Sequence, residues 1–140
     1  MNEQENTETA RRAYELFKEG DIESLMDLYT DDADWENPQT ENVPHTGKRK
    51  GKEQMLEFMS LVGEYSENLH FEPREFVAQG DKVVVLGDYK WRIKPTGKEY
   101  ESDFVHVCTF NDEGKITAFK EYLDTAKARD AYTAQEAQAA

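Results

Sequence analysis

The chain has 140 residues, of which 37% are hydrophobic and 34% are charged, and its formal net charge is −13. This length suits one domain with its own core. A surface of this charge repels nucleic-acid phosphates and anionic membranes, so we expect neither as a partner. The acidity favours a well-solvated surface over the alternative, an adaptation to high salt.

The first part of the chain predicts two helices and a strand. Residues 7–19 place apolar side chains at the i, i+3, i+4 and i+7 positions of a helix. Gly20 follows at a position that favours a left-handed backbone, and Asp21 caps a second helix that ends at Asp31. A short strand is expected over residues 33–37.

A long loop and a third helix come next. Residues 38–51 read as a loop that contains His45 and a basic cluster at residues 48–50. Loops of this length inside a compact domain often form the rim or lid of a site. Residues 52–63 carry apolar side chains on one face and predict a helix.

The second half of the chain predicts antiparallel strands over residues 70–78, 82–94, 99–110 and 115–123, separated by glycine-containing turns. The strand over 99–110 is apolar on both faces, and such a sheet needs a cover on each side. The helices supply one cover. We expect a second subunit to supply the other, giving a homodimer through the outer face of the sheet.

Residues 1–126 are expected to form a single domain, followed by an Ala- and Gln-rich tail over 127–140 that is either helical or frayed. Cys108 is the only cysteine and lies in an apolar strand, so an internal disulfide is excluded and a buried structural thiol is indicated. No apolar run reaches membrane-spanning length and the polar N-terminus is unlike a signal peptide, so we expect a soluble, cytoplasmic protein.

Helices followed by a run of antiparallel strands predict an α+β fold, in which a curled antiparallel sheet wraps around three N-terminal helices. A curled sheet with helices on its concave side leaves a cone-shaped cavity open at one end. Cavities of this kind are natural sites for small molecules.

Several motifs resemble the nuclear transport factor 2-like superfamily, which has a cystatin-like fold. They are Gly20-Asp21 through Trp35-Glu36-Asn37-Pro38, Gly80-Asp81-Lys82-Val83, and Asp112-Glu113-Gly114-Lys115-Ile116 with Glu121-Tyr122-Leu123-Asp124-Thr125. Over residues 8–126 the chain is most similar to SnoaL-like, polyketide cyclase-like proteins and to ketosteroid isomerase-related proteins. The superfamily includes isomerases, cyclases, epoxide hydrolases and non-catalytic binding modules, so the resemblance is specific for the fold and not for an activity.

The resemblance also implies where a ketosteroid isomerase would hold its three functional groups. The general base maps to Asn37, whose amide cannot shuttle a proton at neutral pH. The tyrosine donor maps near Ala13, one place from Tyr14, and the carboxylic-acid donor maps to His106. Steroid isomerisation by that mechanism is therefore not expected.

Two other chemistries of the superfamily remain open. SnoaL-like cyclases are similar in having an aromatic residue near the first strand and a His and an Asp on the late strands, which here are Trp35, His106 and Asp124. A His–Asp pair can move a proton from carbon to oxygen without a metal. Epoxide hydrolase-like chemistry would instead need an Asp-Arg-Asp constellation. The candidates for it on the strands are Arg92, Asp103 and Asp124.

The candidate catalytic residues are thus His106, Asp124 and Asp103. The candidate ligand-pocket residues are Tyr14, Trp35, Asn37, Met55, Met59, Trp91 and Tyr122. Each has a purely structural alternative, such as a hydrogen-bonded core histidine for His106 or a helix cap for Asp124. The three histidines show no metal-ligand spacing, and we expect neither a metal nor another cofactor.

Two functions from different classes fit these residues. The first is a cofactor-independent isomerase, cyclase or lyase that acts on a small, mostly apolar molecule with a carbonyl or hydroxyl group. The second is a non-catalytic small-molecule-binding or dimerisation module with the same pocket. Convergence of two of the acid–base candidates with Asn37 or Tyr14 at one cavity would favour the first.

Overall fold

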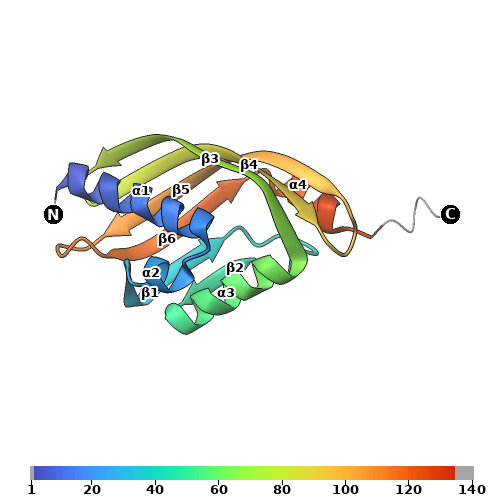
Figure 1. The fold of residues 1–140 in the computed structure, drawn as a ribbon, viewed down its shortest axis with the longest axis horizontal. Coiled ribbons are helices and arrows are strands. Elements are labelled where there is room, and N and C mark those ends of the chain that lie inside the picture. Colours follow the sequence, from blue (N-terminus) through green and yellow to red (C-terminus); the bar gives the residue numbers. More distant parts are fainter. Residues whose placement is uncertain (1, 135–140) are drawn as a thin grey trace.

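The computed structural model describes residues 2–134, which form four helices and six strands. Their order is α1 (Glu3–Glu19), α2 (Ile22–Met26), β1 (Tyr29–Asn37), β2 (Gly47–Lys50), α3 (Lys52–Tyr65), β3 (Ser66–Gln79), β4 (Lys82–Ile93), β5 (Glu99–Phe110), β6 (Ile116–Leu123) and α4 (Thr125–Tyr132). Helices α1, α2 and α3 lie in front of one curled sheet in Figure 1, which confirms the expected α+β fold.

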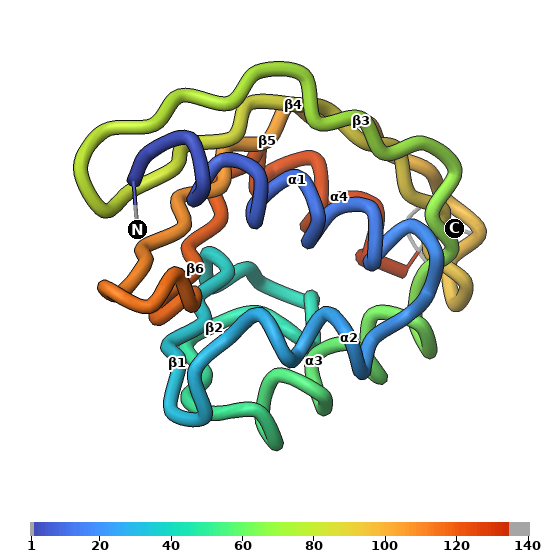
Figure 2. Tube along the Cα trace, turned by 60° about the vertical axis from the view of Figure 1, so that its left-hand side comes forward, coloured from blue at the N-terminus to red at the C-terminus, as the bar shows by residue number. Residues whose placement is uncertain are grey.

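The six strands form one sheet in the order β2-β1-β6-β5-β4-β3. All neighbours are antiparallel except β1 and β6, which run parallel, so the sheet is mixed. Helix α1 packs against β3 and β4, and α3 packs against β1, β2 and β3. Figure 2 shows α1 between β3 and β4 on one side and β1 and β2 on the other.

The two N-terminal helices differ from their predicted bounds. Helix α1 begins at Glu3, because Asn2 and Glu5 form a reciprocal capping box with each other. Its C-terminal Gly20 adopts the predicted left-handed conformation with φ of 76°, and Asp21 caps α2 by accepting a hydrogen bond from Ser24 N. Helix α2 ends at Met26, because the chain is already paired with the sheet from Tyr29 onwards.

Part of the predicted loop is a strand. Residues Gly47–Lys50 form β2, which pairs antiparallel with β1 at one edge of the sheet. The basic cluster of this strand lies opposite acidic residues of β1, and Lys50 Nζ is 3.3 Å from Asp34 Oδ1. Charged residues are suited to an edge strand because they discourage pairing with other chains.

The predicted tail is helical over Thr125–Tyr132, and residues 135–140 of it lie outside the described residues. Ala128 and Ala131 are buried on the inner side of α4. Thr96 Oγ1, in the turn between β4 and β5, donates a hydrogen bond to Ala131 O at 2.6 Å. Helix α4 is therefore packed on the domain.

The inner face of β4 carries the buried side chains of Val83, Val85, Tyr89 and Ile93. Gly87 lies on the same strand, where a Cβ atom would come within 2.5 Å of the Phe104 ring and 2.4 Å of a backbone oxygen. Glycine is needed there because β3, β4 and β5 approach one another closely. Cys108 is buried as predicted.

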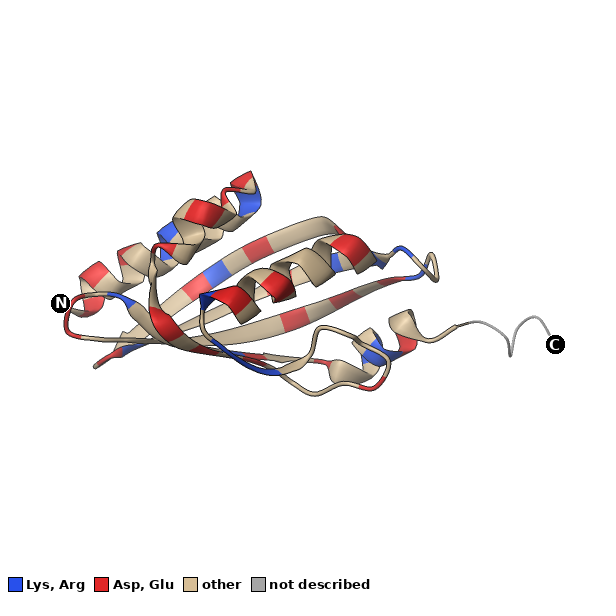
Figure 3. Ribbon diagram, turned by 90° about the horizontal axis from the view of Figure 1, so that it is seen from below, with Lys and Arg blue, Asp and Glu red and all other residues tan. Residues whose placement is uncertain are grey.

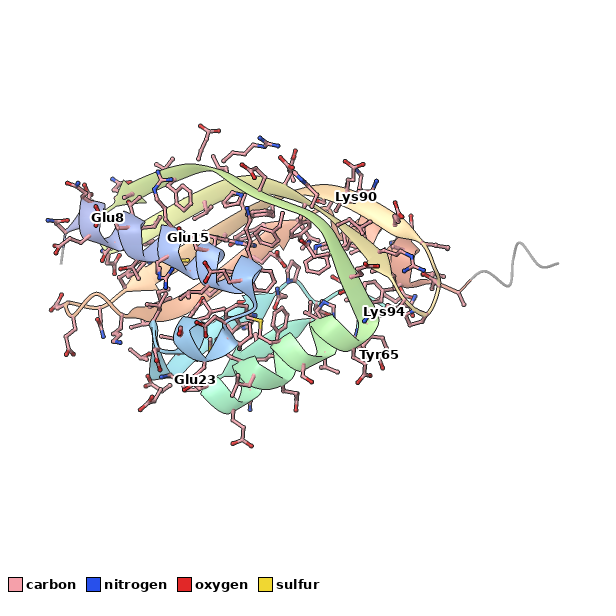
Figure 4. All side chains as sticks on the ribbon, viewed as in Figure 1. Glu8, Glu15, Glu23, Tyr65, Lys90 and Lys94 are labelled. Atoms are coloured by element: carbon pink, nitrogen blue, oxygen red, sulfur yellow. The ribbon has the colours of Figure 1, made fainter. Side chains whose placement is uncertain are left out.

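Side chains fill the space between the helices and the sheet in Figure 4, where the labelled Glu8, Glu15 and Glu23 lie on the exposed helices α1 and α2. Figure 3 shows acidic residues along the helices and on several strands. Within residues 2–134, no helix combines the length and the apolar run needed to cross a membrane.

Candidate functional site

A cavity of about 110 Å³ lies between the concave face of the sheet and helices α1 and α3. Aromatic rings form much of its wall, among them Phe17, Trp35, Phe58, Phe71, Trp91 and Phe119. An engineered cavity of about 150 Å³ holds benzene, so this space suits a molecule of about one ring. Phe17, Met59 and Trp91 also line a surface groove beside α1 and α3, which is therefore adjacent to the cavity.

Glu121 is the centre of the polar groups on the cavity wall. Its Oε2 lies 2.8 Å from His106 Nε2 and accepts a hydrogen bond from the Tyr89 hydroxyl at 3.0 Å. Its Oε1 accepts a hydrogen bond from Asn37 Nδ2 at 2.8 Å. A buried carboxylate is stabilised in its charged form when several donors converge on it in this way.

Trp35 fixes the direction of the Asn37 amide. The indole Nε1–H of Trp35 donates to Asn37 Oδ1 at 2.8 Å, which leaves Nδ2 pointing at Glu121. The parallel register of β1 and β6 pairs Glu36 with Lys120 and so places Asn37 beside Glu121. Asn37 therefore supports a carboxylate from the opposite strand.

Tyr14 extends the network from helix α1. Its hydroxyl oxygen lies 2.7 Å from His106 Nδ1, and the two rings are nearly parallel with centroids 5.8 Å apart. An ionised Glu121 can only accept hydrogen bonds, so His106 carries a proton on Nε2. When His106 is neutral, its Nδ1 accepts a hydrogen bond from the Tyr14 hydroxyl.

The electrostatics of the site favour this arrangement. Burial raises the pKa of Glu121, but the hydrogen bond and charge of His106, together with the hydrogen bonds from Asn37 and Tyr89, lower it below its ordinary value. Burial, followed by nearby Cys108, raises the pKa of Tyr14 well above its ordinary value. At neutral pH the carboxyl group is ionised and the phenol is protonated.

Together, Tyr14, His106 and Glu121 form a continuous line of hydrogen bonds from helix α1 across β5 to β6. Such a line can move a proton from one end to the other while the carboxylate stabilises an imidazolium in the middle. Burial raises the pKa of the Cys108 thiol to about 12, so this cavity-lining group is an unreactive thiol at neutral pH. Within residues 2–134, no three His, Cys, Asp or Glu side chains are grouped to hold a metal ion.

A family model of the SnoaL-like domain matches residues 10–119. The chain belongs to the SnoaL-like domain family. A nuclear transport factor 2-like protein from Burkholderia xenovorans LB400 is 30% identical, with a TM-score of 0.86 over 95% of this chain and 99% of that one. A second such protein, from Burkholderia pseudomallei K96243 and of unknown function, is 27% identical, with a TM-score of 0.84 over 96% of this chain and 100% of that one.

TerC, whose structure was determined after co-crystallization with polyporic acid, is 29% identical, with a TM-score of 0.78 over 91% of this SnoaL-like chain and 98% of that one. No curated protein matches the chain in sequence. The predicted resemblance to the nuclear transport factor 2-like superfamily is confirmed.

Most of the residues predicted for the pocket of this SnoaL-like domain line the cavity. They are Tyr14, Trp35, Asn37, Met59, Trp91 and, from the catalytic candidates, His106. The predicted placement is corrected for Met55 and Tyr122. Met55 is completely buried without lining the cavity, and Tyr122 is 47% exposed because it follows Glu121 and points to the opposite face of β6.

The predicted placement of Asp103 and Asp124 is also corrected. Both side chains are exposed and neither lines the cavity. Asp103 precedes the buried Phe104 and so faces outward, whereas Asp124 caps α4 by accepting a hydrogen bond from Lys127 N. Arg92 is exposed and pairs with Glu67, so the arginine–aspartate constellation of an epoxide hydrolase is not assembled in the cavity.

Glu121 and Tyr89 are functional candidates that the sequence prediction missed. His106 and Glu121 are paired directly across β5 and β6, five residues before Asn111 and seven residues after Gly114. Counting outward from Asn111 and Gly114 would have paired His106 with Phe119, because the irregularity between Thr109 and Phe110 shifts the register. Alternation along β4 places Tyr89 on its inner face, but the hydroxyl contact of Tyr89 with Glu121 depends on how the sheet curls.

Proposed function

We propose that this SnoaL-like chain transfers a proton between carbon and oxygen of a small cyclic carbonyl compound. The observation that carries the proposal is the hydrogen-bonded line from Tyr14 through His106 to Glu121 on the wall of an aromatic cavity. Tyr14 is the group that touches the substrate, because both ring nitrogens of His106 already have partners.

The proposed proton transfer uses only these side chains. The C–H bond next to the carbonyl group breaks, and its proton moves to Tyr14 Oη while the hydroxyl proton of Tyr14 moves to His106 Nδ1. The substrate becomes an enolate, and the imidazolium is stabilised by the Glu121 carboxylate. The raised pKa of Tyr14 disfavours a free tyrosinate, so the two transfers occur together. The reverse sequence returns a proton to the oxygen or to another carbon.

The size and lining of the cavity support a compact, mostly apolar substrate. A volume of about 110 Å³ suits one ring and is too small for a fused four-ring steroid. The aromatic wall favours a flat molecule that packs against rings. A relative, TerC, has been co-crystallized with polyporic acid, which supports binding of a small organic molecule by this fold.

Deuterium uptake tests the proposal. Cyclohexanone in heavy water, followed by proton NMR, should exchange its α-hydrogens faster with the protein than in buffer alone. Tyr14→Phe and His106→Gln should each lower the protein-dependent rate by about 100-fold or more. Tyr122→Phe, on the outer face, is the matched control. No acceleration by the wild type, or an unchanged rate in Tyr14→Phe, would contradict the proposal.

A non-catalytic binding module is the second candidate function. It is favoured by one observation, that both oxygens of Glu121 and both nitrogens of His106 are already paired within the protein. This function predicts that cyclohexanone binds and changes the fluorescence of Trp35 while its deuterium uptake stays at the buffer rate.

A further inference from the structure

His45 lies on the cavity wall at a distance from the Glu121 network. It belongs to the segment between β1 and β2, which the sequence predicted as a loop over the site. Its ring contacts Phe58 of α3 edge to face, with centroids 5.4 Å apart, and Tyr132 of α4 at 5.9 Å. The imidazole therefore contacts two helices, α3 and α4.

The segment that carries His45 is fixed by its own hydrogen bonds. Thr46 Oγ1 donates to Val43 O at 3.0 Å, and Thr40 N donates to Thr46 Oγ1 at 3.1 Å. Thr40 and Val43 are themselves buried. A ring held by buried neighbours on both sides is positioned before any ligand arrives, which lowers the entropic cost of binding.

His45 makes no hydrogen bond with any residue in the described range 2–134, and its Nδ1 is buried without a partner. Burial, opposed by the charge of Glu121 and aided by that of Arg49, lowers the pKa of His45 to about 4. The ring is therefore neutral at pH 7 and carries one proton. A proton on Nδ1 would be a buried, unpaired N–H group, which proteins rarely contain, so we assign the proton to Nε2.

We propose that His45 is a second polar contact for the substrate, and that its Nε2–H donates a hydrogen bond to an oxygen other than the one next to Tyr14. This inference rests on the proposed function and narrows its substrate to a single ring that carries two oxygen atoms. Tyr14 and the Glu121 network handle one oxygen, and His45 recognises the other.

Three features of the described residues support the assignment of one substrate oxygen to Tyr14 and the other to His45. His45 and Glu121 both line the same small cavity, yet no hydrogen bond joins them, so they are separate polar groups on its wall. Phe58, whose ring contacts that of His45, also packs on Trp35 with ring centroids 5.1 Å apart, so the wall beside His45 is apolar. A neutral imidazole without a partner is also a group whose hydrogen bond a ligand can supply without breaking another.

The test compares two ring compounds that differ by one oxygen, cyclohexanone and 1,4-cyclohexanedione, with dissociation constants measured by titration calorimetry. The wild type should bind the dione about 5-fold more tightly, as expected for one added hydrogen bond. This ratio should fall to about 1 in His45→Phe and stay above 2 in His45→Gln, which keeps an N–H donor. His70→Gln, on the exposed part of β3, is the matched control and should keep the wild-type ratio.

A second measurement avoids substitutions altogether. In ¹⁵N-histidine-labelled wild type, the dione should shift the Nε2 resonance of His45, and cyclohexanone should leave it in place. The inference is overturned if the wild type does not prefer the dione, if His45→Phe keeps the preference, or if neither compound shifts this resonance. Deuterium uptake by cyclohexanone, which has no second oxygen, tests the proposed function separately, so the two failures are distinguishable.

Discussion

His106 on β5 and Glu121 on β6 are direct cross-strand neighbours, and their side chains meet with Nε2 and Oε2 2.8 Å apart. These side chains are only 5% and 12% exposed. A buried histidine–carboxylate pair is costly to desolvate and is retained only where further hydrogen bonds complete it. Asn37 and Tyr89 provide those bonds here.

Glu121→Gln should destabilise the fold and remove the proton-transfer activity. The amide would turn an N–H₂ group toward at least one donor of His106, Tyr89 or Asn37, and the negative charge would be lost. We expect the free energy of unfolding, measured by urea denaturation, to fall by about 2–4 kcal/mol. The control Glu113→Gln, in an exposed turn, should change it by less than about 0.5 kcal/mol. Equal effects of the two substitutions would contradict this account.

The buried imidazole of His45 should make stability depend on pH. The pKa of His45 is lowered to about 4 in the folded state from an ordinary value of 6.5, so the unfolded chain binds more protons between these values. Stability should therefore fall as the pH drops from 6.5 toward 4, by at most about 3 kcal/mol. The pKa of Glu121 is lowered in the folded state, so Glu121 adds its own loss of stability only below about pH 4.5, the ordinary pKa of a glutamate.

Urea denaturation of the wild type and of His45→Gln between pH 6.5 and pH 5 measures the histidine contribution by itself. The wild-type free energy of unfolding should rise with pH over this range more steeply than that of His45→Gln. Parallel curves would show that His45 does not change protonation on folding.

Asp124 should matter for stability and not for proton transfer. Its side chain caps α4, so Asp124→Ala should cost about 1 kcal/mol and increase amide hydrogen exchange over Thr125–Tyr132. Asp124→Ser keeps a capping oxygen and should restore most of the protection. If Asp124→Ser lowered deuterium uptake by cyclohexanone as strongly as His106→Gln, the placement of Asp124 outside the site would be wrong.

The outer face of the sheet should be a dimer interface. Val84, Leu86, Val105 and Val107 alternate with the buried residues of β4 and β5 and lie on that face. Exposed Val77 and Tyr122 extend the apolar surface onto β3 and β6. Light scattering should show a homodimer for the wild type and a monomer for Val107→Glu. A 16.2 kDa species alone at micromolar wild-type protein would contradict this expectation, and Ser60→Glu on α3 is the control.

The fold could be predicted because its signals are local. The periodicity of residues 82–94, the glycine at position 20 and the cap at Asp21 each depend on a few neighbouring residues, and all three agree with the structure. Strand β2 was missed because its four charged or small residues have no apolar alternation, and it forms only because β1 offers it a partner.

The site could be predicted only in part, because it depends on registers between strands. Alternation along a strand shows which residues share a face, but it could not show which acidic residue would meet the imidazole of His106. Asp124 looked like a candidate, yet it lies one residue beyond the end of β6, where the chain turns into α4. The partner is Glu121, which the register between β5 and β6 selects.

Because β1 pairs in parallel with β6, the site joins residues that are far apart in the sequence. Asn37 and Glu121 are 84 positions apart, and Tyr14 and His106 are 92 apart. A protein synthesised from its N-terminus therefore lacks the Glu121 carboxylate until β6, Ile116–Leu123, has been synthesised. Contacts between such distant parts form slowly. A site confined to one hairpin could form early, but this site can form only after β6 has been added to the sheet. A chain cut short before β6 would therefore lack the site.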